Sequence, residues 1–443
     1  MARIEPRVLK GFRDYLPPTM IPRQKMLETI EGTFQRFGFA PLMTPALEYL
    51  EILEGKYGEE GESLLYGFQD HGGRQIALRY DLTVPLARVV AQYGEIQQPF
   101  RRYQIAPVWR AEKPARGRFR EFVQCDADIV GSGDMTADGE ILQLACALLD
   151  DLHVENYRIQ VNHRKLLSGL MRRVGVEEGG RERGVLRAID KLPKIGREKT
   201  EKLLGNENGL SPEQISGVFE FLALEGPARE VLDRATGFFD EGSVGRQGVS
   251  ELERLFSIVE ALGLTESVRL DLSIARGLNY YTGTIYETFL GDLPGFGSIM
   301  AGGRYDGLIG AFKGEDLPAV GISLGIDRLL EGLVELGLLR EERSVAKVLV
   351  PVFDEATGPQ AARVAQLLRR GGIACELYPG PVRMGKQFRH AERQGMRWVA
   401  VVGPDELARG KVSVKDLESG EQEEVDEERV VDYLTSRGGG ETR

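Results

Sequence analysis

The segment VWRAEKPARGRFREF (residues 108–122) sets four arginines close to Phe119 and Phe122. Guanidinium groups pair with phosphate oxygens, and an aromatic ring offers a face on which a planar base can stack. The segment therefore predicts a site for a phosphorylated planar ligand. A salt-bridged hairpin exposed to water has the same composition, so this segment alone leaves both interpretations open.

Two glycine-rich segments could let a ligand approach bare backbone. GISLGIDRLLEGL (residues 321–333) leads a strand into a helix whose first turn holds Asp327 and Arg328. In IMAGGRYDGLIGAF (residues 299–312), Gly302 and Gly303 are adjacent. Helix packing and a strand bend explain the same glycines without a ligand.

A third segment, SIARGLNYYTG (residues 273–283), places Arg276 between an alanine and a glycine, shortly before two tyrosines. The sequence becomes strand-like from Tyr281 onward. An arginine entering such a stretch needs a negative partner, either a ligand phosphate or a protein carboxylate.

Composition narrows the class of protein. The 443 residues carry a net charge of −11, four histidines and three cysteines. The cysteines lie far apart and no paired-histidine motif occurs, so neither a disulfide framework nor a structural metal site is expected. Without a long apolar run or an apolar leader, the sequence predicts a cytoplasmic protein that does not cross a membrane. The acidic balance argues against a protein that coats DNA or RNA indiscriminately, but it permits a local basic groove.

Apolar periodicity and turn signals predict the elements that position these residues. A hairpin is expected at Gly72-Gly73, and Asp81 or Thr83 can cap the helix that follows it. The expected helices cover residues 23–37, 81–93, 137–152 and 326–336, and the expected strands cover residues 101–112, 118–131 and 268–306.

Changes in composition divide the chain into four parts. A core over residues 1–176 precedes a charged, leucine-bearing helical insertion over 177–262, and the core resumes over 263–338. After a polar linker, strands alternate with helices near 358–370 and 384–395, which predicts a small α/β domain over 345–437.

Together these segments resemble a known family. FGFAPLMTPALEY (residues 37–49), VWRAE with RFREF, and GISLGIDR resemble, in order, the three signature motifs of class II aminoacyl-tRNA synthetases. KGFRDYLP, LRYDLTVPLAR, ARGLNYYTG and AGGRYDGL resemble the histidyl-tRNA synthetase branch. The resemblance covers nearly the whole chain. It implies an α+β fold with an antiparallel sheet core, flanking helices, a helical insertion and a C-terminal α/β anticodon-binding domain.

The implied activity is ATP-dependent ligation of L-histidine to tRNA(His) through a histidyl-adenylate, with Mg²⁺ on the triphosphate. By resemblance, Arg276 and Arg110 would hold the α-phosphate, and Glu112 would fix the adenine end. Phe122 and Arg328 would sandwich the base, with Arg328 also reaching the outer phosphates. The resemblance assigns no metal ligand.

The resemblance also implies a histidine pocket. Acceptors for the ammonium group would be Asp81, Thr83 and Gln124. The imidazole would be read by Asp128 and Tyr281, with Tyr280 lining the pocket. A polar strand face explains Gln124 and Asp128, four residues apart, equally well.

Two basic clusters are candidates for tRNA contact. Lys113 and Arg116 would meet the acceptor end. Along the predicted helix near 384–395, a basic face could follow tRNA phosphates, although a merely solvated face has the same pattern. Its members are Lys386, Arg389, Arg393 and Arg397. The motif at residues 37–49 further implies a homodimer.

Two other classes of protein share parts of this pattern. A non-catalytic, synthetase-like regulatory subunit of histidine biosynthesis would bind histidine, but such proteins usually lack the C-terminal domain and residues of the RGLNYY stretch. A tRNA-binding or stress-sensing module would not need the full set of arginines. The ligase interpretation therefore fits the sequence best.

Overall fold

A computed structural model describes residues 4–176, 179–275 and 280–438. The chain forms two compact units. The larger comprises Met1–Arg13 with Met26–Leu338, and the smaller comprises Asp14–Lys25 with Leu339–Arg443. No helix in the described part of the chain is long and apolar enough to cross a membrane.

The larger unit is built on an eight-stranded sheet in the order β1-β5-β6-β11-β10-β9-β7-β8. Neighbours from β5 to β7 run antiparallel, and β1 and β8 pair in parallel at the two edges. The strands are β1 Ala40–Pro41, β5 Phe100–Trp109, β6 Glu121–Val130, β7 Tyr157–His163, β8 Val268–Leu270, β9 Thr284–Leu290, β10 Met300–Arg304 and β11 Ala319–Gly325. This is the antiparallel core that the sequence predicts.

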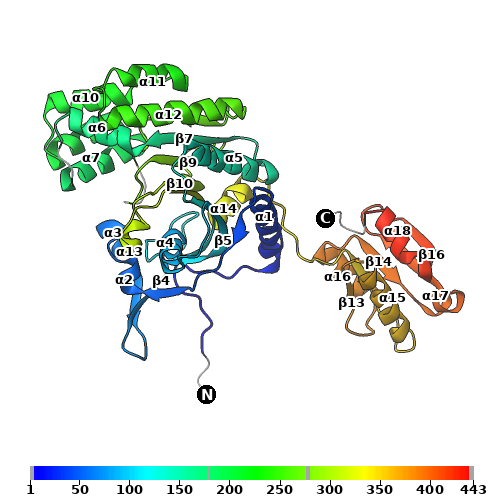
Figure 1. Cartoon of the computed structure of the whole chain (residues 1–443). Coiled ribbons are helices and arrows are strands. Elements are labelled where there is room, and N and C mark those ends of the chain that lie inside the picture. Colours follow the sequence, from blue (N-terminus) through cyan, green and yellow to red (C-terminus); the bar gives the residue numbers. More distant parts are fainter. Residues whose placement is uncertain (1–3, 177–178, 276–279, 439–443) are drawn as a thin grey trace. The chain divides into compact units, whose positions relative to one another are not determined.

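Helices flank this sheet, and a second, three-stranded sheet lies in the same unit (Figure 1). The small sheet has the order β2-β4-β3, and its β3–β4 hairpin turns at Gly73, whose φ of 79° suits glycine. Its strands are β2 Leu47–Tyr49, β3 Tyr66–Gln69 and β4 Gln75–Leu78. The helices are α1 Pro17–Arg36, whose residues up to Lys25 belong to the smaller unit, α2 Leu50–Leu53, α3 Gly58–Glu62, α4 Thr83–Gln92, α5 Met135–Asp151, α13 Gly310–Lys313 and α14 Ile326–Glu335.

The described residues between β7 and β8 are helical and gather at one end of the larger unit (green in Figure 1). His163, at the end of β7, ties them to the sheet, because its Nε2 lies 2.8 Å from Glu251 in α12. Burial alone would raise the pKa of Glu251, but hydrogen bonds from His163 and Lys165 lower it to about 2. The helices are α6 Arg164–Arg173, α7 Gly180–Asp190, α8 Leu192–Ile195, α9 Arg197–Lys202, a π-helical turn Leu203–Glu207, α10 Pro212–Leu222, α11 Ala228–Thr236 and α12 Val244–Ala261.

The smaller unit contains a five-stranded sheet in the order β13-β12-β14-β15-β16. The first three strands are parallel, as the predicted alternation of strands and helices requires, whereas β15 and β16 form an antiparallel hairpin. Trp398, 2% exposed, lies in the apolar core. The elements are β12 Val348–Val350, α15 Gly358–Arg370, β13 Cys375–Leu377, α16 Met384–Gln394, β14 Trp398–Val401, α17 Pro404–Arg409, β15 Lys411–Asp416, β16 Gln422–Asp426, a 3-10 turn Glu427–Arg429 and α18 Val430–Ser436.

Candidate active site

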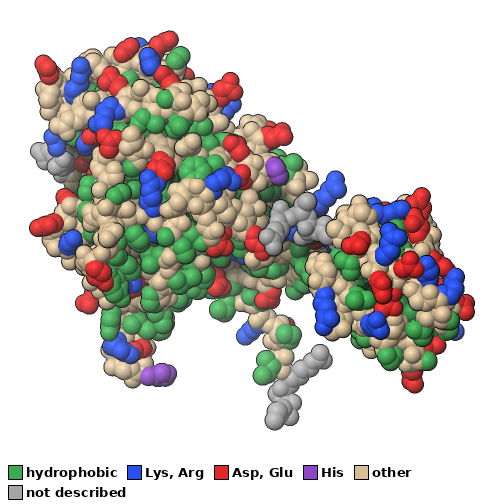
Figure 2. All heavy atoms as spheres, turned by 45° about the vertical axis from the view of Figure 1, so that its right-hand side comes forward, with side chains coloured by type: hydrophobic (Ala, Val, Ile, Leu, Met, Phe, Trp, Pro, Cys, Tyr) green, Lys and Arg blue, Asp and Glu red, His purple; other side chains and the backbone are tan. Residues whose placement is uncertain are grey.

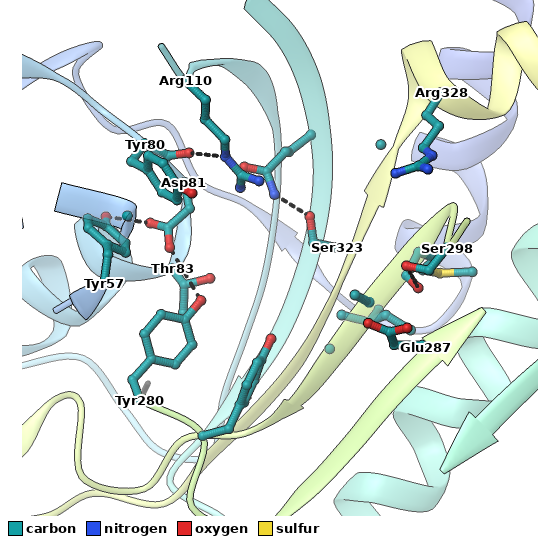
Figure 3. A pocket seen from close by; sticks show the side chains of 18 of the residues that line it. Tyr57, Tyr80, Asp81, Thr83, Arg110, Tyr280, Glu287, Ser298, Ser323 and Arg328 are labelled. Carbon is teal, nitrogen blue, oxygen red and sulfur yellow. Dashed lines mark hydrogen bonds between the residues drawn. The ribbon is translucent and has the colours of Figure 1, made fainter. Parts of the chain in front are cut away.

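A cavity of about 770 Å³ is lined by residues of the large sheet and by loops around it. Side chains on a strand alternate between its two faces, so every second residue of β6 lines the cavity. These residues are Phe122, Gln124, Asp126 and Asp128, and Ser323 on β11 lies opposite Asp126. In Figure 3, Asp81, Thr83, Tyr57 and Tyr280 lie on one side and Arg328 on the other.

Asp81 is held by groups from three separate segments. Its Oδ1 accepts hydrogen bonds from the Tyr57 hydroxyl at 3.0 Å and from the Val84 backbone N–H at 3.1 Å. Its Oδ2 accepts one from the Tyr280 hydroxyl at 3.3 Å. The bond from Val84 caps the first turn of α4, as the sequence predicts for Asp81. Burial raises the pKa of Asp81, and the hydrogen bonds and Arg110 oppose that rise.

Asp128 forms a buried ion pair with Arg102 on the neighbouring strand. These residues face each other in the β5–β6 register, and Asp128 Oδ2 lies 2.6 Å from Arg102 Nη2. The Arg102 side chain has no exposed surface. Asp128 Oδ1 accepts a hydrogen bond from the Tyr305 hydroxyl. Burial raises the pKa of Asp128, and Arg102 and Tyr305 counter that effect.

Ser323 lies beside the two other polar residues of β6. Gln124 Nε2 donates to the Ser323 hydroxyl at 2.5 Å, and Ser323 faces Asp126 in the β6–β11 register. Burial raises the pKa of Asp126 to about 7, Arg102 opposes the rise, and Asp128 and Asp81 add to it. The sheet face therefore offers a row of buried acceptors to a ligand that carries N–H groups.

Arg110 brings positive charge to the cavity beside aromatic rings. Its Nε donates to the Tyr80 carbonyl oxygen at 3.2 Å. Its guanidinium carbon lies 4.3 Å from the centre of the Tyr80 ring and 5.1 Å from that of Phe122. These contacts fix the direction of the guanidinium and leave its terminal nitrogens available for a phosphate.

Arg328 and Glu112 also line the cavity. Arg328 Nη2 donates to the Phe296 carbonyl oxygen, and its guanidinium carbon lies 5.5 Å from the Phe296 ring centre. Glu112 lies 3.5 Å from Arg118 Nη1. The cavity thus joins a row of carboxylates with a set of arginines, which suits a zwitterionic amino acid and a polyphosphate side by side.

The helical region contributes a basic side to the same cavity. Arg183 and Arg187 in α7 and Lys191, which directly follows it, are four residues apart and so share one helical face. Two further cations line the cavity beside them. Together the five cations are Arg183, Arg187, Lys191, Lys194 and Arg164. Sequence reasoning missed these residues, although the regular spacing of the first three was visible.

Comparisons with known proteins bear directly on this arrangement. Residues 11–329 match the family model described as Histidyl-tRNA synthetase, and residues 347–437 match that described as Anticodon binding domain. The chain belongs to the histidyl-tRNA synthetase family. The fold class predicted from the sequence is therefore confirmed.

Individual members of the histidyl-tRNA synthetase family match over almost their full length. A histidine–tRNA ligase of Rhodopirellula baltica is 43% identical over 95% of this chain and 96% of its own. One of Wolinella succinogenes is 43% identical with the same coverage. The crystal structure of histidyl-tRNA synthetase from Nostoc sp. PCC 7120 superposes with a TM-score of 0.88 at 35% identity, covering 98% of this chain and 100% of that one.

A Bacillus halodurans structure described as an ATP phosphoribosyltransferase regulatory subunit/histidyl-tRNA synthetase shares the fold. Its TM-score is 0.72 at 24% identity, and the match covers 87% of this chain and 97% of that one. Likeness at this identity concerns the fold alone. The near-full-length likeness to histidine–tRNA ligases at about 40% identity supports the ligase that the sequence predicts, and the regulatory-subunit alternative is less well supported.

The structure brings together most of the residues that the family resemblance assigns. One cavity is lined by Asp81, Thr83, Arg110, Glu112, Phe122, Gln124, Asp128, Tyr280, Tyr281 and Arg328. Arg276 lies outside the described residues. Sequence reasoning missed Tyr57, Asp126 and Ser323, which line the cavity, and Arg102 behind it. The alternation along β6 was a signal that could have found Asp126.

The two basic clusters assigned to tRNA differ in their surroundings. Lys113 is exposed, whereas Arg116 forms an ion pair with Glu335. On α16, the exposed side chains of Lys386, Arg389 and Arg393 are available to a partner. The prediction that Arg397 belongs to this helical face is wrong. Helix α16 ends at Gln394, because Gly395 takes a left-handed conformation. Arg397 instead forms an ion pair with Asp416 at 3.1 Å.

Proposed function

We propose that this protein joins L-histidine to tRNA(His) in an ATP-dependent reaction through a histidyl-adenylate, and that it does so in the cytoplasm. The observation that carries the proposal is a single cavity, in a histidyl-tRNA synthetase chain, with buried carboxylates on its sheet face and arginines beside aromatic rings. Incubation with ATP, labelled histidine and tRNA should place label on tRNA as an alkali-labile ester. Absence of labelled tRNA under these conditions would contradict the proposal.

In the first step, an oxygen of the histidine carboxylate attacks the α-phosphorus of ATP. The bond to the bridging oxygen breaks, and pyrophosphate leaves with its electron pair. Arg110 would stabilise the charge that develops on the α-phosphate, since its position is already fixed by Tyr80. Arg276 stays a proposal from the resemblance, as a second cation at the same phosphate.

In the second step, a hydroxyl of the terminal tRNA ribose attacks the carbonyl carbon of the adenylate. The hydroxyl loses its proton, and AMP departs. Both steps depend on alignment and electrostatics rather than on a covalent enzyme intermediate. Phe122, Glu112 and Arg328 would hold the adenosine and outer phosphates that keep the reacting atoms in line.

The histidine would lie against the sheet face. Its ammonium group would meet Asp81, Thr83 and Gln124, while Asp128 and Tyr281 would read the imidazole, with Tyr280 lining the pocket. A rival side chain without ring N–H groups would leave these buried acceptors unpaired, which is the basis of strong discrimination.

Mg²⁺ fits this site as a companion of ATP. No group of three or more histidine, cysteine, aspartate or glutamate side chains forms a metal cage among residues 4–176, 179–275 and 280–438. Mg²⁺ usually keeps several waters and binds substrate phosphates with one or two carboxylates. Glu287, which lines the cavity, is the nearest fit to that role. The ion would neutralise the triphosphate.

The basic face of α16 supports binding of the tRNA anticodon arm. Replacing Lys386 and Arg389 together by glutamate should raise the Michaelis constant for tRNA about tenfold, because two phosphate contacts would be lost. Histidine-dependent pyrophosphate exchange should not change. The matched control replaces Arg369 and Arg370, exposed on α15, by glutamate. Equal effects of the two pairs on charging would contradict a specific role for α16.

We also propose a homodimer formed through the surface around β2. Figure 2 shows hydrophobic side chains (green) gathered on the lower part of the larger unit. A groove there is lined by the exposed Met43, Leu47, Tyr49 and Tyr93. Exposed apolar patches of this kind mark interaction sites.

Replacing Leu47 by aspartate should convert the dimer to a monomer in sedimentation velocity and lower charging at least tenfold, because a charge would be buried at the interface. Leu407 in the smaller unit is the matched control, since both leucines are 42% exposed. A Leu47→Asp protein that sediments like the unaltered protein would exclude this surface as the interface.

A further inference from the structure

Three buried carboxylates line the cavity, and two of them have a protein partner near each oxygen while keeping lone pairs for a ligand. Asp81 accepts hydrogen bonds at both oxygens, from Tyr57 and Val84 at one and from Tyr280 at the other. Asp128 contacts Tyr305 through one oxygen and Arg102 through the other. Among the described residues, Asp126 Oδ1, Asp128 Oδ2 and Gln124 Oε1 are all buried without a hydrogen-bond partner, but Asp128 Oδ2 lies 2.6 Å from Arg102, whereas Asp126 Oδ1 has no such ion pair.

The position of Asp126 is fixed by its neighbours on both sides. It faces Ser323 in the β6–β11 register, and the Ser323 hydroxyl accepts a hydrogen bond from Gln124. The side chain is 2% exposed and lines the cavity. A buried acceptor without a hydrogen bond costs free energy. Because Asp126 lines a cavity, a ligand that donates a hydrogen bond to it would remove this cost.

The surrounding charge indicates which donor suits this place. The charges that act on Asp126 are those of Arg102 on β5, Asp128 on its own strand and Asp81 before α4. Ser323 on β11 lies opposite Asp126, and burial, Asp128 and Asp126 each raise the pKa of Tyr281. Arg102 repels an ammonium group, whereas a neutral imidazole can donate its N–H without that penalty. Asp81 remains the acceptor that the family resemblance assigns to the ammonium group.

We propose that Asp126 accepts a hydrogen bond from the ring N–H of the substrate histidine and is a specificity-determining residue beside Asp128. This inference rests on the proposed function, because it assigns a role within the same substrate pocket. The assignment differs from that drawn from the family resemblance, in which Gln124 and Asp128 flank Asp126 on the strand but Asp126 has no role.

The charge state of Asp126 is consistent with this role. Burial raises its pKa to about 7, so near neutral pH the free pocket holds a mixture of acid and carboxylate. A donated ring N–H favours the carboxylate and lowers the pKa. Replacement by asparagine removes the buried charge, so the empty protein should melt at a slightly higher temperature at pH 8 even as histidine binding weakens.

The test compares histidine with 3-(thiazol-4-yl)alanine, which keeps one ring nitrogen but has sulfur in place of the ring N–H. Calorimetric titration of the full-length Asp126→Asn protein should show histidine binding weakened about tenfold or more. Binding of the analogue should change by less than threefold, because the donor is already missing. Equal losses for both ligands, or no loss for histidine, would overturn the proposal.

Two controls keep the outcome interpretable. ATP affinity and melting temperature report whether the Asp126→Asn protein is folded. Ser323→Ala is a second variant, which removes the hydroxyl opposite Asp126 and keeps the Asp126 carboxylate. The Ser323→Ala protein should also bind histidine more weakly, with a larger loss of affinity for histidine than for the analogue. Equal losses of affinity for the two ligands would count against the proposal. If the unaltered protein bound no histidine at all, the proposed function itself would fail, which is a different result from failure of the Asp126 assignment alone.

Discussion

Replacing Arg110 by glutamine should slow adenylate formation by about 10²–10³-fold, the loss typical of one preorganised donor at a developing negative charge. The guanidinium is fixed by the Tyr80 carbonyl at 3.2 Å and by the Tyr80 and Phe122 rings, so it needs no rearrangement during the reaction. Glutamine keeps a polar side chain of similar reach but removes the charge.

The effect should fall on the turnover number and leave the Michaelis constant for histidine nearly unchanged, because histidine would bind at the carboxylate end of the cavity. Pre-steady-state measurement of adenylate formation gives the rate directly. Arg118→Gln is a matched control at the same cavity, where Arg118 already faces Glu112 at 3.5 Å, and we expect a loss below tenfold. An Arg110→Gln rate within tenfold of the unaltered protein would remove Arg110 from the phosphate site.

Replacing Asp128 by alanine should both destabilise the protein and weaken histidine binding. Arg102 has no exposed side-chain surface, and its ion pair with Asp128 measures 2.6 Å. Removing one member of a buried pair leaves an uncompensated charge and typically costs about 3–5 kcal/mol. We expect a value near the lower end, since Asp126 also faces Arg102. Tyr305 would lose its acceptor as well.

A second variant separates stability from recognition. Changing Arg102 to Met and Asp128 to Leu together removes both charges and should recover much of the stability, as apolar replacements of buried pairs often do. Histidine-dependent exchange should stay low in this double variant, because Asp128, one of the two carboxylates proposed to read the imidazole, is still absent. Thermal melting and exchange kinetics measured side by side provide the comparison. A double variant with restored exchange would show that Asp128 acts only as the counterion of Arg102.

The sequence predicted the elements of the site well because their signals are local. Helices α4 and α14 and strands β5 and β6 follow from apolar periodicity and from turn residues beside them. Arg397 was misplaced because four-residue spacing continues past a helix end that only Gly395 marks. The β15–β16 hairpin was not anticipated, since its outer strand is polar and exposed.

The contacts within the site that could not be predicted join residues on different strands. They depend on which strands are neighbours in the sheet and on the register between them. Arg102 precedes Asp128 by many residues, and only the β5–β6 register brings them together. Ser323 reaches Asp126 through the β6–β11 register in the same way. The ion pair of Arg116 with Glu335 joins a loop to the end of α14, a contact that no periodicity encodes. Such cross-element pairs decide which polar groups stay available to a ligand.

Pyrophosphate exchange into ATP, measured with each amino acid in turn, tests the central claim most directly. We expect exchange that requires histidine and is at background with the other amino acids, since adenylate formation is reversible and the pocket reads the imidazole. Calorimetry on the same preparation establishes whether histidine binds. Histidine binding without histidine-dependent exchange in the folded protein would contradict the account and favour a regulatory, non-catalytic member of the fold.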